Sequence, residues 1–147
     1  MAPPADEYVV YRGQYLTVEF YYTQAGQIPA REFYVLRAEE ERTRFFHIVQ
    51  HLVDNPPGIQ LPKTMFNMED EEERIFAIKP YSGRYLGFYT RDRRFVITAA
   101  FEKQTQKLGV RERQHVQTAI IRKQDYLART AVRTYYRPAL PPRRRKT

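Results

Sequence analysis

The chain has 147 residues, a length that fits a single domain. It has no Trp and no Cys, and the absence of Cys excludes both a disulfide framework and a thiolate metal site. No apolar run reaches the roughly 18 residues that a membrane span needs, and the N-terminus lacks the charged start and apolar stretch of a signal peptide. We therefore expect a cytoplasmic protein that does not enter a membrane.

The formal charge of +8 at pH 7 is concentrated in the last third of the chain. Residues 1–100 carry 12 Lys and Arg against 14 Asp and Glu, whereas residues 101–147 carry 13 against 3. This asymmetry predicts that the last third contacts a polyanion or an acidic protein. A solvated basic helix followed by a disordered tail would give the same pattern.

The first part of the chain predicts one strand and two helices. Residues 1–14 are expected to form a flexible N-terminus, and the β-forming residues 15–22 predict the first strand. Pro29 fits the first position of a helix, and no Pro or Gly follows until Pro56. One helix of that length would span roughly 40 Å, so we expect a break between residues 36 and 40. Apolar residues of the second helix recur at helical spacing and predict its buried face: Phe45, Ile48, Val49, Leu52 and Val53.

The second part predicts three strands and one long helix. Residues 59–73, which end in five consecutive acidic residues, are expected to form a solvated loop. Short turns then separate strands expected at residues 74–81, 84–90 and 94–101. A helix over residues 110–134 should bury Val116, Ile120, Leu127 and Ala131. The Pro- and Arg-rich residues 137–147 predict a disordered basic tail.

The connection between the last strand and the last helix carries spaced lysines, which suit a surface that binds phosphates. Residues 101–107 read Phe-Glu-Lys-Gln-Thr-Gln-Lys. This run resembles the Phe-x-Lys-Lys-Thr-x-Lys-Thr-Pro signature of HigB-type toxins in the RelE/ParE superfamily. Residues 122–127 are similar to the basic-basic-x-x-Tyr-Leu end of the family's last helix. The order β-α-α-β-β-β-α expected for residues 15–136 is also that of the family.

The resemblance implies an α+β fold with a small, mostly antiparallel sheet, an N-terminal helical hairpin on one face and a C-terminal helix. It implies the toxin of a type II toxin–antitoxin pair, an endoribonuclease that cleaves mRNA on the ribosome. The ribose 2′-OH attacks the adjacent phosphate, so we expect no metal and no cofactor. The implied partners are mRNA, the ribosome and a small antitoxin with a helix-turn-helix domain.

Four cations are the expected catalytic residues. Lys103 matches the family's first lysine and is the candidate base or transition-state clamp, and Lys107 matches the later one. Residues 75–79 resemble the family's Leu-x-Glu-Leu-Arg, which places Lys79 on its arginine. In the next strand Leu86 stands where the family has a second arginine, and Arg84, on the same strand face by alternation, would replace it.

Tyrosines and further polar residues are the expected RNA contacts. Tyr81, Tyr85 and Tyr89 share a face by alternation, where they would either stack on bases or pack within the sheet. The remaining expected contacts are Arg74, Arg91, Arg94, Gln104 and Arg111.

The sequence predicts no histidine in this site. The family's usual histidine before the final Phe is absent, because Ala99 and Ala100 precede Phe101. His47 and His51 lie four residues apart but lack the Glu of a His-Glu-x-x-His motif, so we expect a surface pair.

Two other functions fit the same residues. One is a ParE-type inhibitor of DNA gyrase, which needs no nuclease site and is favoured by Leu86 and the missing histidine. The other is a non-catalytic RNA-binding or interaction protein on the same scaffold. If the protein binds RNA, as a nuclease or without catalysis, the basic tail would add nonspecific phosphate affinity that falls as the salt concentration rises.

Overall fold

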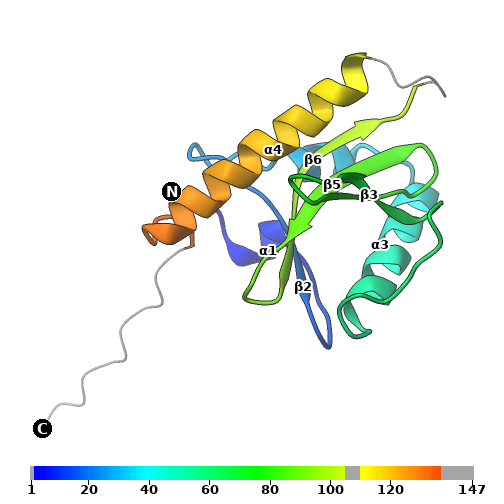
Figure 1. Ribbon diagram of the computed structural model, residues 1–147, viewed down its shortest axis with the longest axis horizontal. Helices are drawn as coiled ribbons and strands as arrows, with labels where there is room; N and C mark the ends of the chain where they lie inside the picture. The colour runs from blue at the N-terminus through cyan, green and yellow to red at the C-terminus, as the bar shows by residue number, and fades with distance from the viewer. Residues whose placement is uncertain (1, 105–109, 137–147) are drawn as a thin grey trace, which may run out of the picture.

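The computed structural model describes residues 2–104 and 110–136, which form an α+β fold built on one sheet (Figure 1). Within these residues the sheet has six strands in the order β1-β2-β6-β5-β4-β3. The parallel pair is β2 with β6, and the other neighbours run antiparallel. The strands are β1 (Val9–Arg12), β2 (Thr17–Phe20), β3 (Phe66–Asp70), β4 (Ile75–Ile78), β5 (Gly83–Tyr89) and β6 (Arg94–Glu102).

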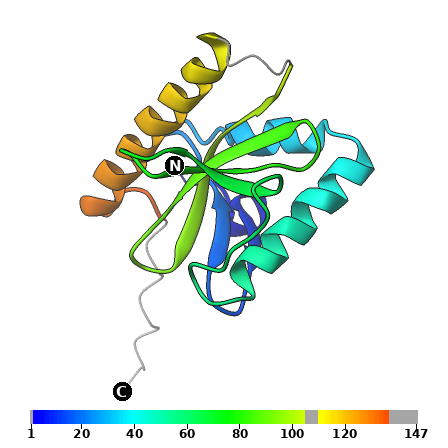
Figure 2. The same cartoon turned by 45° about the vertical axis from the view of Figure 1, so that its right-hand side comes forward.

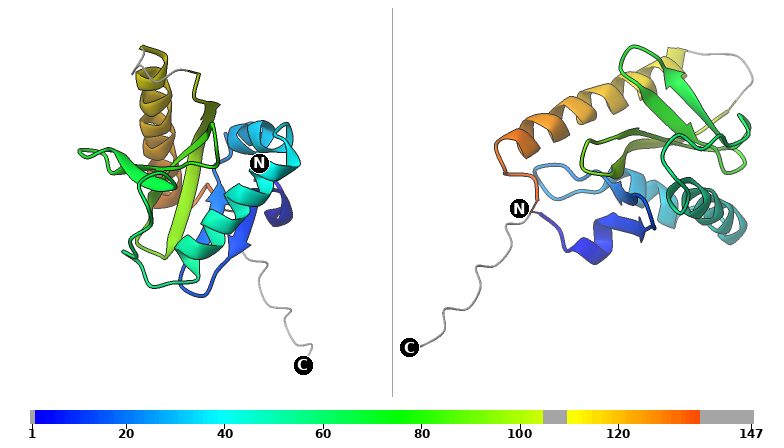
Figure 3. Two further views of the ribbon diagram at one scale, coloured as in Figure 1. Left: turned by 90° about the vertical axis from the view of Figure 1, so that its right-hand side faces the viewer. Right: turned by 60° about the horizontal axis from the view of Figure 1, so that its bottom comes forward.

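Helices cover both faces of this sheet. They are α1 (Ala5–Tyr8), α2 (Pro29–Val35), α3 (Glu39–Val53) and α4 (Val110–Ala131). Figures 2 and 3 show α4 on one face and α2 with α3 on the other. Among the described residues, no helix combines the length and apolar character needed to cross a bilayer.

The α+β class and the helix break are confirmed. Helix α2 ends at Val35 and α3 begins at Glu39, inside the predicted interval. Every apolar residue predicted to face the core from α3 is buried: Phe45, Ile48, Val49, Leu52 and Val53. His47 and His51 are exposed, as expected of a surface pair.

The sheet is larger than predicted because the N-terminus is part of it. Residues 1–14 were expected to be flexible, whereas residues 5–8 form α1 and residues 9–12 form β1, which pairs antiparallel with β2. The Tyr11 hydroxyl donates a hydrogen bond of 2.7 Å to Asp54 at the end of α3. This contact across 43 residues fixes β1, and local sequence gives no sign of it.

The predicted acidic loop also contains a strand. Its middle forms β3, which pairs with β4, and the Phe66 and Phe76 rings stack at 5.4 Å. Such cross-strand aromatic pairs stabilise a ladder even where acidic residues adjoin it. The predicted tail, residues 137–147, lies outside the described residues.

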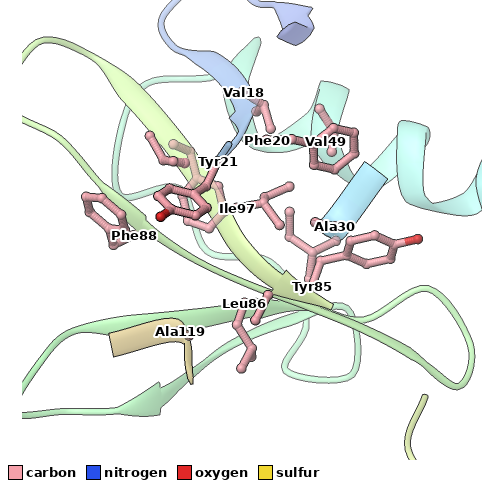
Figure 4. Close-up of a cluster of buried hydrophobic side chains, with 14 of the residues drawn as sticks. Val18, Phe20, Tyr21, Ala30, Val49, Tyr85, Leu86, Phe88, Ile97 and Ala119 are labelled. Carbon is pink, nitrogen blue, oxygen red and sulfur yellow. The ribbon is translucent and has the colours of Figure 1, made fainter. Parts of the chain in front are cut away.

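The buried face of α4 differs from the predicted one. Leu127, predicted to be buried, is 45 % exposed, and Ala131 is also exposed. The α4 residues that are buried are Ala119, Ile120, Tyr126 and Arg129. Figure 4 shows Leu86 of β5 pointing toward Ala119 while Tyr85 points to the opposite side, toward α2. Ile120 is buried as predicted and Val116 is half-buried. The difference lies in the C-terminal half of α4, where Tyr126 and Arg129 are buried in place of Leu127 and Ala131.

Candidate functional site

Three of the predicted cations come from the ends of three neighbouring strands. We call Lys79, Arg84 and Lys103 the cation cluster. The Lys79 backbone N–H donates to the Met65 carbonyl at 2.9 Å, and that of Lys103 donates to the Ser82 carbonyl at 2.8 Å. These bonds extend the β3–β4 and β5–β6 pairings to the cluster. Arg84 faces Phe101 across the ladder, so alternation places Arg84 and Lys103 on the same face.

Within the cluster, the charges of Arg84 and Lys103 act on Lys79. Burial lowers the pKa of Lys79, the charges of Arg84 and Lys103 lower it further, and nearby Glu69 opposes the shift. The Lys79 ammonium lies 3.8 Å from a Glu69 carboxylate oxygen. Burial also lowers the pKa of Arg84, whose Nη1 donates to the Tyr81 carbonyl at 2.7 Å. Crowded cations with lowered pKa values are characteristic of sites that bind anions or transfer protons.

A histidine from α4 packs on Phe101, the residue that pairs with Arg84 across the ladder, whereas the sequence analysis expected no histidine in this site. The His115 ring stacks on Phe101 with 4.1 Å between ring centroids and 3° between their planes. Burial lowers the pKa of His115, an effect that Glu112 opposes, so the imidazole is neutral at pH 7. His115 lies four residues before the buried Ala119, and this helical spacing is the sequence signal that could have placed it against the sheet.

The backbone of the site is held in place from the α3 side of the sheet. Arg37 forms an ion pair with Glu41, and its guanidinium also donates to the Ser82 hydroxyl at 3.3 Å and to Glu102 at 3.4 Å. A Cβ at Gly83 would lie 3.1 Å from the Glu41 carboxylate. These contacts fix the β4–β5 turn between Lys79 and Arg84, so the cluster is preorganised.

Of the two alternatives for the three tyrosines, base stacking or packing within the sheet, packing holds for Tyr85 and Tyr89. Tyr85 is fully buried on the α3 side of the sheet, with its ring 4.2 Å from that of Phe45. Tyr89 packs 5.0 Å from Phe95. Tyr81 is different, since it lies in the turn between Lys79 and Arg84 and is 64 % exposed. Of these three, Tyr81 is the exposed one, Tyr89 is half-buried and Tyr85 is buried.

The other predicted contacts divide between two ends of the molecule. Gln104 follows Lys103, and Arg111 lies exposed in the first turn of α4. Arg91 and Arg94 lie at the opposite end of the β5–β6 hairpin, about 30 Å along β6 from Lys103. Arg74 precedes β4 and so lies at the other end of that strand from Lys79. Lys107 lies outside the described residues.

Arg94, one of the predicted RNA contacts, pairs with a buried carboxylate. Its guanidinium lies 3.0 Å from the carboxylate of Glu19, a residue that is only 3 % exposed. The Tyr136 hydroxyl donates to the same carboxylate at 2.7 Å. A buried carboxylate needs such partners, because an unpaired charge in the interior is costly.

The assembled site contains three cations, a neutral imidazole and one exposed tyrosine. The described residues hold no group of three or more His, Asp or Glu arranged to bind a metal ion. Such a site can bind a phosphate and accept or donate protons at its edge. Neither a scan against protein-family models nor a search of curated proteins found a match to this chain.

Proposed function

We propose that the protein is the toxin of a toxin–antitoxin pair and cleaves mRNA without a metal ion. The main support for the proposal is that Lys79, Arg84 and Lys103 lie close together at one end of the sheet, where His115 stacks on Phe101. The HigB-like run at residues 101–107 supports the choice of RNA as the phosphate ligand.

The proposed reaction is attack of a ribose 2′-OH on the adjacent phosphorus. Neutral His115 accepts the 2′-OH proton as the new oxygen–phosphorus bond forms. Arg84 and Lys103 bind the non-bridging oxygens, where negative charge increases in the transition state. The Lys79 ammonium donates a proton to the 5′-oxygen as its bond to phosphorus breaks. The lowered pKa of Lys79 makes it a stronger acid than an ordinary lysine. The products are a 2′,3′-cyclic phosphate and a 5′-hydroxyl.

The proposed setting is the cytoplasm, with mRNA on the ribosome as substrate. Exposed Tyr81 stacks on a base next to the cleaved bond, and Gln104 and Arg111 contact flanking nucleotides. A small antitoxin with a helix-turn-helix domain neutralises the protein by covering or distorting the basic face.

A ParE-like inhibitor of DNA gyrase is the second candidate, and one observation favours it. Leu86, at the position of a family arginine, is 1 % exposed and packs toward Ala119 of α4. A charged side chain would not fit there, so this cation is absent from the site. A non-catalytic RNA-binding protein on the same scaffold is the third reading.

A cell-free translation assay run beside a gyrase supercoiling assay separates these candidates. The proposal predicts that translation stops, that transcripts carry new 5′-hydroxyl and 2′,3′-cyclic phosphate ends, and that supercoiling is unaffected. Inhibited supercoiling with intact transcripts would support the gyrase reading. Translation that proceeds on RNA-bound, uncut transcripts would support the binding protein.

A further inference from the structure

A cavity of about 1150 Å³ lies between the C-terminal half of α4 and the β5–β6 turn. Its lining includes no residue of the cation cluster and draws instead on the opposite end of the hairpin. The volume is slightly above the roughly 300–1,000 Å³ typical of ligand pockets. We call the aromatic residues of the lining, together with Leu127, its floor: Phe88, Tyr89, Tyr126, Leu127 and Tyr136.

The rim of the cavity is positively charged. Its lining has four cations and one acid: Arg91, Arg94, Lys123, Arg133 and Asp92. Arg94 is paired with Glu19 and Asp92, and Lys123 lies 3.8 Å from a Glu73 carboxylate oxygen. Arg91 and Arg133 are exposed, and neither forms an ion pair with any residue in the described ranges. The rim therefore complements a ligand that carries negative charge.

The aromatic rings of the floor pack against other side chains of the protein. The Tyr136 ring has the Arg94 guanidinium 4.4 Å from its centroid. Phe88 and Tyr126 pack edge to face at 5.5 Å, and both are 2 % exposed. Stacking of a nucleic-acid base requires an open ring face, which the buried Phe88 and Tyr126 do not offer. An apolar side chain of a ligand needs only an apolar cavity to enter, which this site provides.

We infer that this cavity is the docking site of an acidic peptide segment from a partner protein. An apolar side chain of the peptide packs beside Leu127 on the floor, and flanking carboxylates bind Arg91 and Arg133. A central apolar anchor with a charged rim is the usual arrangement of a peptide-binding interface. The inference concerns the end of the molecule away from the cation cluster and holds whether or not the protein cleaves RNA.

The test is selection of peptides from a random displayed library on the immobilised full-length protein. We expect the recovered peptides to combine acidic residues with a Leu, Phe or similar anchor. A labelled recovered peptide is then titrated against two variants. Leu127→Glu places a carboxylate in the cavity, whereas Ile121→Glu makes the same change at a 62 % exposed position of α4 outside it. Both positions are exposed on a helix, so both variants should fold.

The expected result is binding at least about tenfold weaker to Leu127→Glu and unchanged to Ile121→Glu. Arg91→Glu should weaken it as well. Peptides without enrichment of acidic residues, or equal binding to both α4 variants, would overturn the inference. A labelled oligouridylate that binds the wild type and loses its affinity in Leu127→Glu would also overturn it, since the cavity would then bind RNA.

Discussion

The imidazole of His115 lies parallel to the Phe101 ring, with 4.1 Å between the centroids. Phe101 pairs across the ladder with Arg84 and lies two residues before Lys103. This stacking therefore brings the first half of α4 to the end of the sheet where the cations meet. It also gives the site a titratable group that is neutral near pH 7, which a cluster of Lys and Arg alone lacks.

Replacement of His115 by Phe keeps a flat ring against Phe101 and removes the proton acceptor. We expect His115→Phe to slow RNA cleavage by about 10²–10⁴-fold. In the wild type the rate should fall as pH drops through the pKa of His115, below the ordinary 6.5, because the protonated imidazole cannot accept a proton. A pH–rate profile checks both points, with exposed His47→Phe as the control. An acidic limb that persists in His115→Phe would contradict the assignment.

Loss of a phosphate-binding cation should change the salt dependence of RNA binding. We expect Arg84→Ala to bind a 2′-deoxy, non-cleavable oligonucleotide more weakly and to lower the slope of log K against log salt by about 0.7. Fluorescence titrations at several salt concentrations measure this slope. Arg44→Ala removes the same charge from an exposed position on α3 and should leave the slope unchanged. Equal slopes in the two variants would show that Arg84 does not contact phosphate.

The two tyrosines of the predicted stacking platform should respond in opposite ways to substitution. The Tyr85 hydroxyl is buried and has no hydrogen-bond partner within the described residues. Tyr85→Phe should raise the free energy of unfolding by about 1 kcal/mol, because an unsatisfied buried polar group is removed. It should not change RNA affinity. Tyr81→Ala should weaken RNA binding without changing stability. Denaturant unfolding and RNA titration of both variants test the pair, and weaker RNA binding by Tyr85→Phe would contradict the structure.

Arg94 should matter for stability rather than for RNA. Arg94→Ala leaves the carboxylate of Glu19 with the Tyr136 hydroxyl but without its cation. We expect the free energy of unfolding to fall by about 2 kcal/mol, less than for a fully buried pair because the Arg94 side chain is 31 % exposed. Arg91→Ala, at an exposed position nearby, should change it by no more than about 0.5 kcal/mol. Urea unfolding measures both, and equal losses would contradict a structural role for Arg94.

Sequence patterns predicted those parts of the fold that depend on local periodicity. The break before Glu39 and the buried stripe of α3 follow from helix length and apolar spacing, and both are confirmed. Strands β1 and β3 were missed because they depend on partners far along the chain. Tyr11 is fixed by Asp54, and Phe66 by Phe76, and neither contact is visible in a local window.

For the site, too, the sequence predicted what depends on a local pattern and missed what depends on distant contacts. Alternation along β5 and β6 was enough to bring Arg84 and Lys103 together. His115 was missed because its place depends on how the first half of α4 packs on Phe101 of β6, a tertiary contact that a local pattern does not show. Alternation also grouped Tyr85 with Tyr81. The pattern does not show which face of the sheet the helices cover, and Tyr85 lies on the face covered by α3.

The most direct test of RNA cleavage by the cation cluster is primer extension on abundant transcripts after induced expression in a bacterium. We expect discrete new 5′ ends within minutes of induction, absent from a folded Lys79→Ala, Lys103→Ala double variant expressed at the same level. Growth arrest with intact transcripts, or the same ends in the double variant, would contradict the proposal.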